Sequence, residues 1–162
     1  MESAPAARSK QGLEARRQMR VITDLVTIKA AASETGGAYA LYETETPVSG
    51  GVPPHRQRYD DEGFYVLEGR YRFLVEGDEF EFGPGAFVHV PRGTTHAVVN
   101  VGVDPGRMLI IVTPGVVHDE FMDDIGDPAD RPPWEPDMAR VLAVAPKYGI
   151  DFRTSDPFTN DS

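Results

Sequence analysis

The chain has 162 residues, the length of one ordinary domain with room for a hydrophobic core. Its formal net charge of −10 repels nucleic acid and anionic membrane surfaces, so we expect neither as a partner. It contains no cysteine, which excludes disulfides, thiolate metal sites and a cysteine nucleophile. A metal site in this chain must therefore use imidazole or oxygen ligands.

The first 18 residues are polar and basic and lack an apolar segment, which predicts a flexible leader in residues 1–18 without a chemical role. No part of the chain has the run of about 18 apolar residues that a membrane span needs. We therefore expect a soluble protein of the cytoplasm. An organellar transit peptide is the alternative, and Glu2 and Glu14 count against it.

Residues 19–115 alternate short β-prone segments with turns that contain Gly, Pro or acidic side chains, at intervals of roughly ten residues. The predicted strands are Val26–Ala30, Ala38–Glu43, Phe64–Leu67, Tyr71–Val75, Glu79–Phe82, Phe87–Val90, Ala97–Asn100 and Met108–Val112. Their short connections favour antiparallel neighbours over a parallel sheet. This part of the chain therefore predicts an all-β sandwich or barrel.

Residues 116–162 have a different pattern. Val117, Phe121 and Ile125 are four residues apart and Gly126 follows them, which predicts a short amphipathic helix. After a proline-rich connector, a second helix is predicted before Gly149, and Pro146 should end or kink it in its last turn. We expect these short C-terminal helices and the tail to pack on one side of the barrel.

Two stretches combine histidines with strand patterns. In PPHRQRYDDEGFYVLEG, residues 53–69, alternation places His55 and Gln57 on one face, ahead of Glu62 and an apolar strand. The second stretch is GAFVHVPRGTTHAVVN, residues 85–100, which contains His89 and His96. His89 points to the face opposite its valine neighbours, so we assign it no role.

These two stretches resemble the two motifs of the cupin superfamily. The second motif is matched at every fixed position, by Gly85, Pro91, Gly93, His96 and Asn100. The fixed places of the first motif fall on His55, Gln57, Glu62 and Gly69. The resemblance extends from about Thr27 to Ile150 and is to the small single-domain, quercetinase-like cupins. It implies a double-stranded β-helix, or jelly roll, that holds one metal ion, and a homodimer.

The resemblance assigns the metal ligands to His55, Gln57, Glu62 and His96, and it makes Glu62, His55 and His96 the candidate catalytic residues. Two imidazoles and a carboxylate suit a divalent ion of Fe, Mn, Ni, Co or Zn and leave positions open for substrate. The departure from the family that concerns the metal is Gln57, where the motif has a second histidine. Its amide is a weak ligand, a hydrogen-bond donor to substrate, or a relic of a lost site.

Alternation also predicts the lining of the substrate pocket. Phe64 and Val66 share the inward face with Glu62, and Val98 and Asn100 share it with His96. Such a pocket is mostly apolar, which favours an uncharged or aromatic substrate. Asn100 has a second interpretation, in which its amide fixes the backbone. The remaining histidine, His118, is expected on the exposed side of its helix and is given no role.

Three functions are compatible with this pattern. The first is a metal-dependent dioxygenase acting on a small enolic or aromatic metabolite, in which the ion makes the deprotonated substrate electron-rich. The second is a non-oxidative cyclase, isomerase or dehydratase that uses Glu62 with His55 or His96 as an acid and base pair. The third is a small-molecule-binding module without catalysis, because the fold alone does not determine function.

Overall fold

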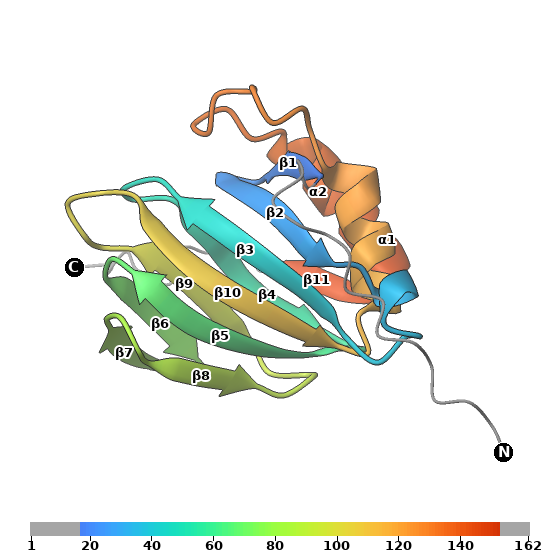
Figure 1. The fold of residues 1–162 in the computed structure, drawn as a ribbon, viewed down its shortest axis with the longest axis horizontal. Coiled ribbons are helices and arrows are strands. Elements are labelled where there is room, and N and C mark those ends of the chain that lie inside the picture. The colour runs from blue at the N-terminus through green and yellow to red at the C-terminus, as the bar shows by residue number, and fades with distance from the viewer. Residues whose placement is uncertain (1–16, 153–162) are drawn as a thin grey trace, which may run out of the picture.

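The computed structural model describes residues 17–152, and within them eleven strands form two antiparallel sheets that face each other (Figure 1). The six-stranded sheet has the order β1 (Gln18–Val21), β2 (Asp24–Ala30), β3 (Ala40–Thr46), β10 (Gly106–Thr113), β5 (Asp61–Glu68) and β8 (Phe87–Val90). The five-stranded sheet has the order β11 (Ile150–Phe152), β4 (Gly51–Gln57), β9 (His96–Asn100), β6 (Tyr71–Val75) and β7 (Asp78–Phe82). The prediction of an all-β jelly roll is confirmed.

Most strands lie where the alternation of apolar and polar residues predicts them. Strands β6 and β8 have the predicted bounds, whereas β5 begins at Asp61 and not at Phe64. Strands β1, β4 and β11 were not among the predicted strands. Strand β4 contains Pro53 and Pro54, which lack the N–H groups of a regular ladder, and its register with β9 shifts between Val52 and His55.

Two hydrophobic clusters lie inside the molecule. One fills the space between the sheets, where Phe73, Tyr71 and Val66 are fully buried. The other lies where the helices cover the ends of β1, β2 and β11 (Figure 1). Its larger members are Met19, Tyr42, Phe121, Met122, Ile125, Val141, Tyr148 and Ile150. The helices therefore close one end of the sandwich with apolar side chains.

The helical region follows the predicted pattern. Helix α1 (Val116–Ile125) ends at Gly126, and α2 (Met138–Val144) changes at Ala145 into the 3₁₀ turn η2 (Ala145–Tyr148). The change coincides with Pro146, which has no N–H for an α-helical bond. A further 3₁₀ turn, η1 (Ala32–Glu34), lies between β2 and β3.

The described residues contain no helix that is both long and apolar enough to cross a membrane. Of the predicted leader, only Arg17 and Gln18 are described, and Gln18 opens β1; the rest of the leader, and the tail after Phe152, lie outside the described residues.

Candidate metal centre

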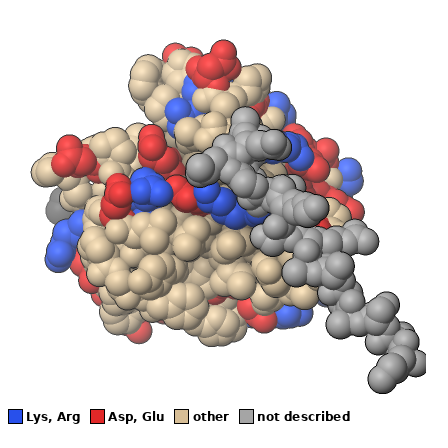
Figure 2. All heavy atoms as spheres, in the orientation of Figure 1, with Lys and Arg blue, Asp and Glu red and all other residues tan. Residues whose placement is uncertain are grey.

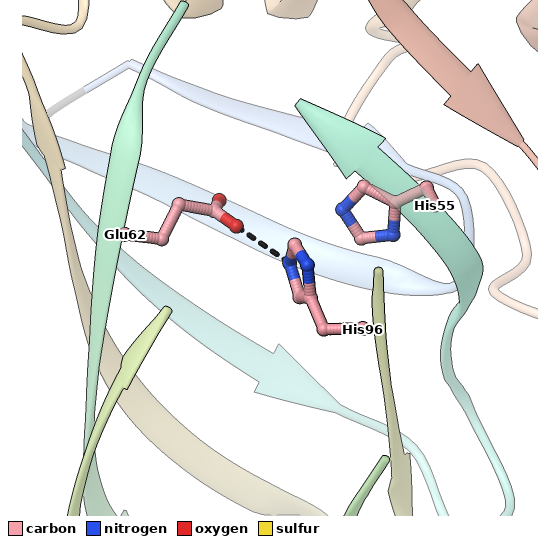
Figure 3. A group of neighbouring side chains, drawn as sticks. All are labelled: His55, Glu62 and His96. Atoms are coloured by element: carbon pink, nitrogen blue, oxygen red, sulfur yellow. Dashed lines mark hydrogen bonds and ion pairs between the residues drawn. The ribbon is translucent and has the colours of Figure 1, made fainter. Parts of the chain in front are cut away.

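Three of the four predicted ligand residues meet between the two sheets. His55 on β4 and His96 on β9 are neighbours across one sheet, and Glu62 reaches them from β5 of the other sheet (Figure 3). One ligand atom of each residue lies within 4.8 Å of the others, and all three side chains are buried. Ligands at about 2.1 Å from one divalent ion have separations of this order.

The two imidazoles are held in the same way. Nδ1 of His55 lies 2.9 Å from the carbonyl oxygen of Pro53, and Nδ1 of His96 lies 3.0 Å from that of Thr94. Because a carbonyl oxygen only accepts, both Nδ1 atoms carry the proton, and Nε2 is left as the ligand atom. Metal-binding imidazoles are commonly oriented in this way.

The charges of the site suit a cation. Burial alone would raise the pKa of Glu62, but the hydrogen bond from His96 and its charge lower that pKa to about 2. Burial and the neighbouring His96 lower the pKa of His55 to about 3, so its ring is neutral at pH 7. Burial also works against a charged His96, yet the 2.7 Å contact with Glu62 raises its pKa overall. A bound ion would replace the proton on His96 Nε2.

Gln57 is buried on the same strand as His55, and its side chain borders the same cavity. Its Oε1 atom has no hydrogen-bond partner among the described residues. A buried carbonyl oxygen without a donor costs about 1–3 kcal/mol, so such an atom in a cavity wall indicates a group that binds there. An ion or a substrate hydroxyl would satisfy it, and the donor set therefore fits a divalent metal.

The prediction that His118 lies on the exposed side of its helix is wrong. His118 is buried, with Nε2 3.6 Å from Glu62 Oε1 and Nδ1 3.4 Å from the hydroxyl of Tyr42. The sequence contains the signal, because His118 lies three, four and seven residues before the buried Phe121, Met122 and Ile125. It therefore belongs to the buried stripe of the helix.

A cavity of about 80 Å³ connects these side chains. Its polar lining includes His55, Gln57, Glu62, His96 and His118, and its apolar lining includes the predicted Phe64 and Val98. The prediction that Val66 and Asn100 line the same cavity is wrong. Four residues of extended chain take Asn100 roughly 13 Å from His96, although both face inward.

Both of these residues have structural surroundings instead. Val66 is fully buried in the core between the sheets. The amide of Asn100 donates to the carbonyl oxygens of Thr46 and Asp104 at 3.0 and 2.9 Å, which fixes two loops. His89 on β8 is exposed, as its place in the alternation predicts.

Two facing antiparallel sheets with a buried histidine and glutamate centre between them define the class of this protein, and residues 42–112 match the family model described as a cupin domain. The chain belongs to the cupin superfamily. Within it the chain is quercetinase-like: it is 31% identical over 133 residues to quercetin 2,3-dioxygenase of Bacillus subtilis. That alignment covers 80% of this chain and 39% of the relative, so the chain spans about two fifths of the relative's length.

Solved structures agree with this fold. A predicted oxalate decarboxylase from Thermotoga maritima superposes with a TM-score of 0.58 over 62% of this chain and 93% of its own, at 16% identity. The cupin domain of Schizosaccharomyces pombe Cnp3 superposes with a TM-score of 0.55 over 67% and 76%, also at 16% identity. At these identities the likeness extends to the fold alone.

Proposed function

We propose that the chain is a metal-dependent dioxygenase of a small enolic or aromatic metabolite. The observation that carries the proposal is the buried set of His55, Glu62 and His96, whose ligand atoms lie within 4.8 Å of one another beside a cavity. The similarity to a relative named as a quercetin dioxygenase supports the reaction class. The ion is one of Fe, Mn, Ni, Co or Zn, because imidazole and carboxylate ligands suit all five.

His55, Glu62 and His96 would hold the ion, with Gln57 Oε1 as a neutral fourth donor. A bound ion supplies Lewis acidity, which favours the deprotonated, electron-rich form of an enol or phenol. Glu62 Oε1 lies on the side of the carboxylate away from His96 and is placed to accept the substrate's hydroxyl proton. Phe64 and Val98 exclude water from the cavity and position the substrate by apolar contact.

The volume of the cavity helps to choose between a small enolic substrate and a larger aromatic one. An apolar protein cavity of about 150 Å³ accommodates benzene. The 80 Å³ found here is smaller, so an enolisable metabolite of a few heavy atoms fits better than a multi-ring flavonol. Among candidate substrates we therefore place small enolisable carbonyl compounds ahead of flavonols.

The experiment that tests the reaction is oxygen uptake by metal-loaded protein, measured with a small enolisable carbonyl compound and with a flavonol. The proposal predicts uptake with the first in a one-to-one ratio to substrate consumed, and little with the second. His96→Ala should abolish uptake, whereas His89→Ala, which changes an exposed histidine on β8, should not. Substrate turnover without oxygen uptake would contradict the dioxygenase proposal.

A second function is favoured by one observation, the 2.7 Å contact of Glu62 with His96. A buried carboxylate and imidazole in contact form an acid and base pair that needs no oxidant. The alternative is therefore a cyclase, isomerase or dehydratase. Turnover that continues without oxygen and is lost in Glu62→Gln would favour this non-oxidative enzyme. Ligand binding without any turnover would indicate a small-molecule-binding module instead.

A further inference from the structure

We propose that Asp24 and Thr44 form a second polar binding site in the cavity, for an uncharged hydrogen-bonding group of the substrate such as a carbonyl oxygen. Both residues line the same cavity as the metal centre, and they are only 4% and 3% exposed. Neither residue takes part in the chemistry proposed above. This second site belongs to the cavity of the proposed function, on which the inference rests for calling the ligand a substrate.

The strand register places this second site away from the metal centre. Thr44 on β3 lies between Val26 of β2 and Met108 of β10, and both of these apolar neighbours also line the cavity. The row of paired residues that contains Glu62 crosses β3 at Ala40. Ala40 is four residues from Thr44, or roughly 13 Å along the strand. A group bound at Thr44 therefore occupies a different part of the cavity from a group bound by the ion.

The hydroxyl of Thr44 is the group that indicates a ligand. Its Oγ1 atom is buried and has no hydrogen-bond partner among the described residues. A hydroxyl removed from water without a partner destabilises the folded protein, and valine would fill the same space without this cost. Because a hydroxyl can both donate and accept, a carbonyl or hydroxyl oxygen of a bound molecule would satisfy it.

Asp24 supplies a second polar group beside this hydroxyl. The pairing of β2 with β3 makes Asp24 the diagonal neighbour of Thr44 on the inward face. The guanidinium of the nearby Arg20 donates to the carbonyl oxygens of Arg131 and Thr23 and not to this carboxyl. Burial raises the pKa of Asp24 to about 7, so below that pH the carboxyl keeps a proton that it can donate. An acceptor bound between Asp24 and Thr44 can therefore receive a hydrogen bond from each.

The test uses two probes of almost the same shape, butan-2-one and 2-methylbut-1-ene, which differ in a carbonyl oxygen against a methylene group. NMR titration of metal-free protein at pH 6 gives both dissociation constants, followed at the methyl groups of Val26 and Met108 beside Thr44. Thr44→Val keeps the shape of the side chain and removes its hydroxyl. It should weaken binding of the ketone about 3- to 10-fold and leave binding of the alkene unchanged. Thr44→Ser, which keeps the hydroxyl, should retain the preference for the ketone.

Three further variants complete the comparison. Thr27→Val is the matched control, because Thr27 lies on the opposite face of β2 from Asp24 and its hydroxyl accepts from Gln18. It should change neither dissociation constant. Asp24→Asn offers an N–H donor in place of the O–H donor and should retain the preference for the ketone. Asp24→Leu has no polar atom at this position and should lose that preference.

Denaturant unfolding separates a ligand site from a structural hydroxyl. Ligand-free Thr44→Val should be at least as stable as the unmodified protein, since its hydroxyl has no partner to lose among the described residues. A clear loss of stability in Thr44→Val would overturn the inference, because the hydroxyl would then have a structural partner such as buried water. Absence of ketone binding to the unmodified protein, or ketone binding that Thr44→Val leaves unchanged, would overturn it as well. Because the titrations use metal-free protein, failure to bind metal would contradict the proposed function and leave this test intact.

Discussion

Gln57 is the residue at which this chain departs from the cupin motif, and its environment explains how an amide serves there. The side chain is buried in the cavity wall with an oxygen that has no donor among the described residues. Leaving such an atom unpaired destabilises the folded protein. A residue that costs stability in the empty protein and gains a partner from a bound ion or substrate is typical of a functional site.

Gln57→Leu tests this interpretation, because leucine has a similar volume and no polar atom. We expect the free energy of unfolding of the metal-free protein to rise by about 1–3 kcal/mol, since the unpaired oxygen is removed. Metal affinity should fall in the same variant, whereas Gln57→His should raise it. Denaturant unfolding and Co²⁺ titration measure the two effects. Loss of stability in metal-free Gln57→Leu would show that the amide has a structural partner.

Asp24 is a buried carboxyl that makes the stability of the fold depend on pH. Burial raises the pKa of its carboxyl to about 7, against the lowering effects of Thr46, Thr23 and Arg20. The folded state thus keeps a proton that the unfolded chain releases above about pH 4, so stability falls as pH rises from there to about 7. Asp24→Asn removes this effect. The free energy of unfolding of this variant, minus that of the unmodified protein, should therefore increase by about 2–3 kcal/mol from pH 5 to pH 8.

Thermal unfolding at pH 5 and pH 8, in the presence of a chelator, measures the Asp24 effect. The exposed Asp78→Asn in β7 is a matched control for loss of one negative charge. Equal stability changes at the two pH values in Asp24→Asn would contradict the argument.

The site could be predicted in part from the sequence. The motif spacing brought His55, Glu62 and His96 together, and strand alternation placed Phe64 in the cavity wall. Alternation shows which face of the sheet a side chain lies on, but not how far along the strand it lies from the metal site. Val66 and Asn100 were therefore predicted too close to Glu62 and His96. His118 was missed because its helix lies far along the chain, and only the packing of α1 over the barrel brings it to Glu62.

At the scale of elements, the strand β4 determines the geometry of the centre, since it carries both His55 and Gln57. It was the strand hardest to find, because its prolines interrupt the pattern of a strand. Its start lies very close to β9: a Cβ atom at Gly51 would be 1.9 Å from the carbonyl oxygen of Val98. Glycine at this position therefore permits the pairing that places His55 beside His96.

Gly51→Ala should destabilise the protein by more than about 3 kcal/mol, because β4 must move from β9 or the fold must accept a severe clash. Gly77→Ala is the control, since Gly77 also has a positive φ and, its chain neighbours apart, no atom of residues 17–152 lies within 4 Å of its Cβ position. It should cost only about 1–2 kcal/mol of backbone strain. Denaturant unfolding measures both, and equal costs would refute the role given to the close approach.

At the scale of the whole molecule, the outer face of the six-stranded sheet is apolar although the chain is strongly acidic. Tyr65, Phe87 and Ile111 are 42%, 58% and 36% exposed, and the last two lie over Gly63. Figure 2 shows few charged side chains across this part of the sheet. The rim carries paired charges of both signs, Arg107 with Glu43 and Arg92 with Asp61. Such a face is compatible with a second copy of the chain.

We therefore predict a homodimer through this face. Phe87→Glu places a charge at the most exposed of these three apolar side chains and should shift the protein toward monomer, with little change in its stability as a monomer. Light scattering coupled to size-exclusion chromatography, over a range of concentrations, measures the mass. Val103→Glu, at a highly exposed position in the loop before β10, is the control. A protein that is monomeric before any substitution would contradict the prediction.

The antiparallel β-sandwich was more predictable than its short strand β11 and the order of strands in its sheets. Turn residues and alternation predicted antiparallel strands and a β-sandwich, because those signals are local. The strand β11 was not predicted, because three residues after Gly149 carry too little pattern, yet it pairs with β4 beside His55. The order of strands in the two sheets depends on contacts between distant segments and is not contained in local patterns.

His55, Glu62 and His96 form the buried set that we propose binds one divalent ion. The most direct test is metal content per chain by mass spectrometry, on protein purified without chelator, beside His96→Ala and His89→Ala. We expect close to one ion per chain in the unmodified protein and in His89→Ala, and almost none in His96→Ala. No bound metal in the unmodified protein, even after incubation with iron, manganese, cobalt, nickel and zinc, would contradict the proposal.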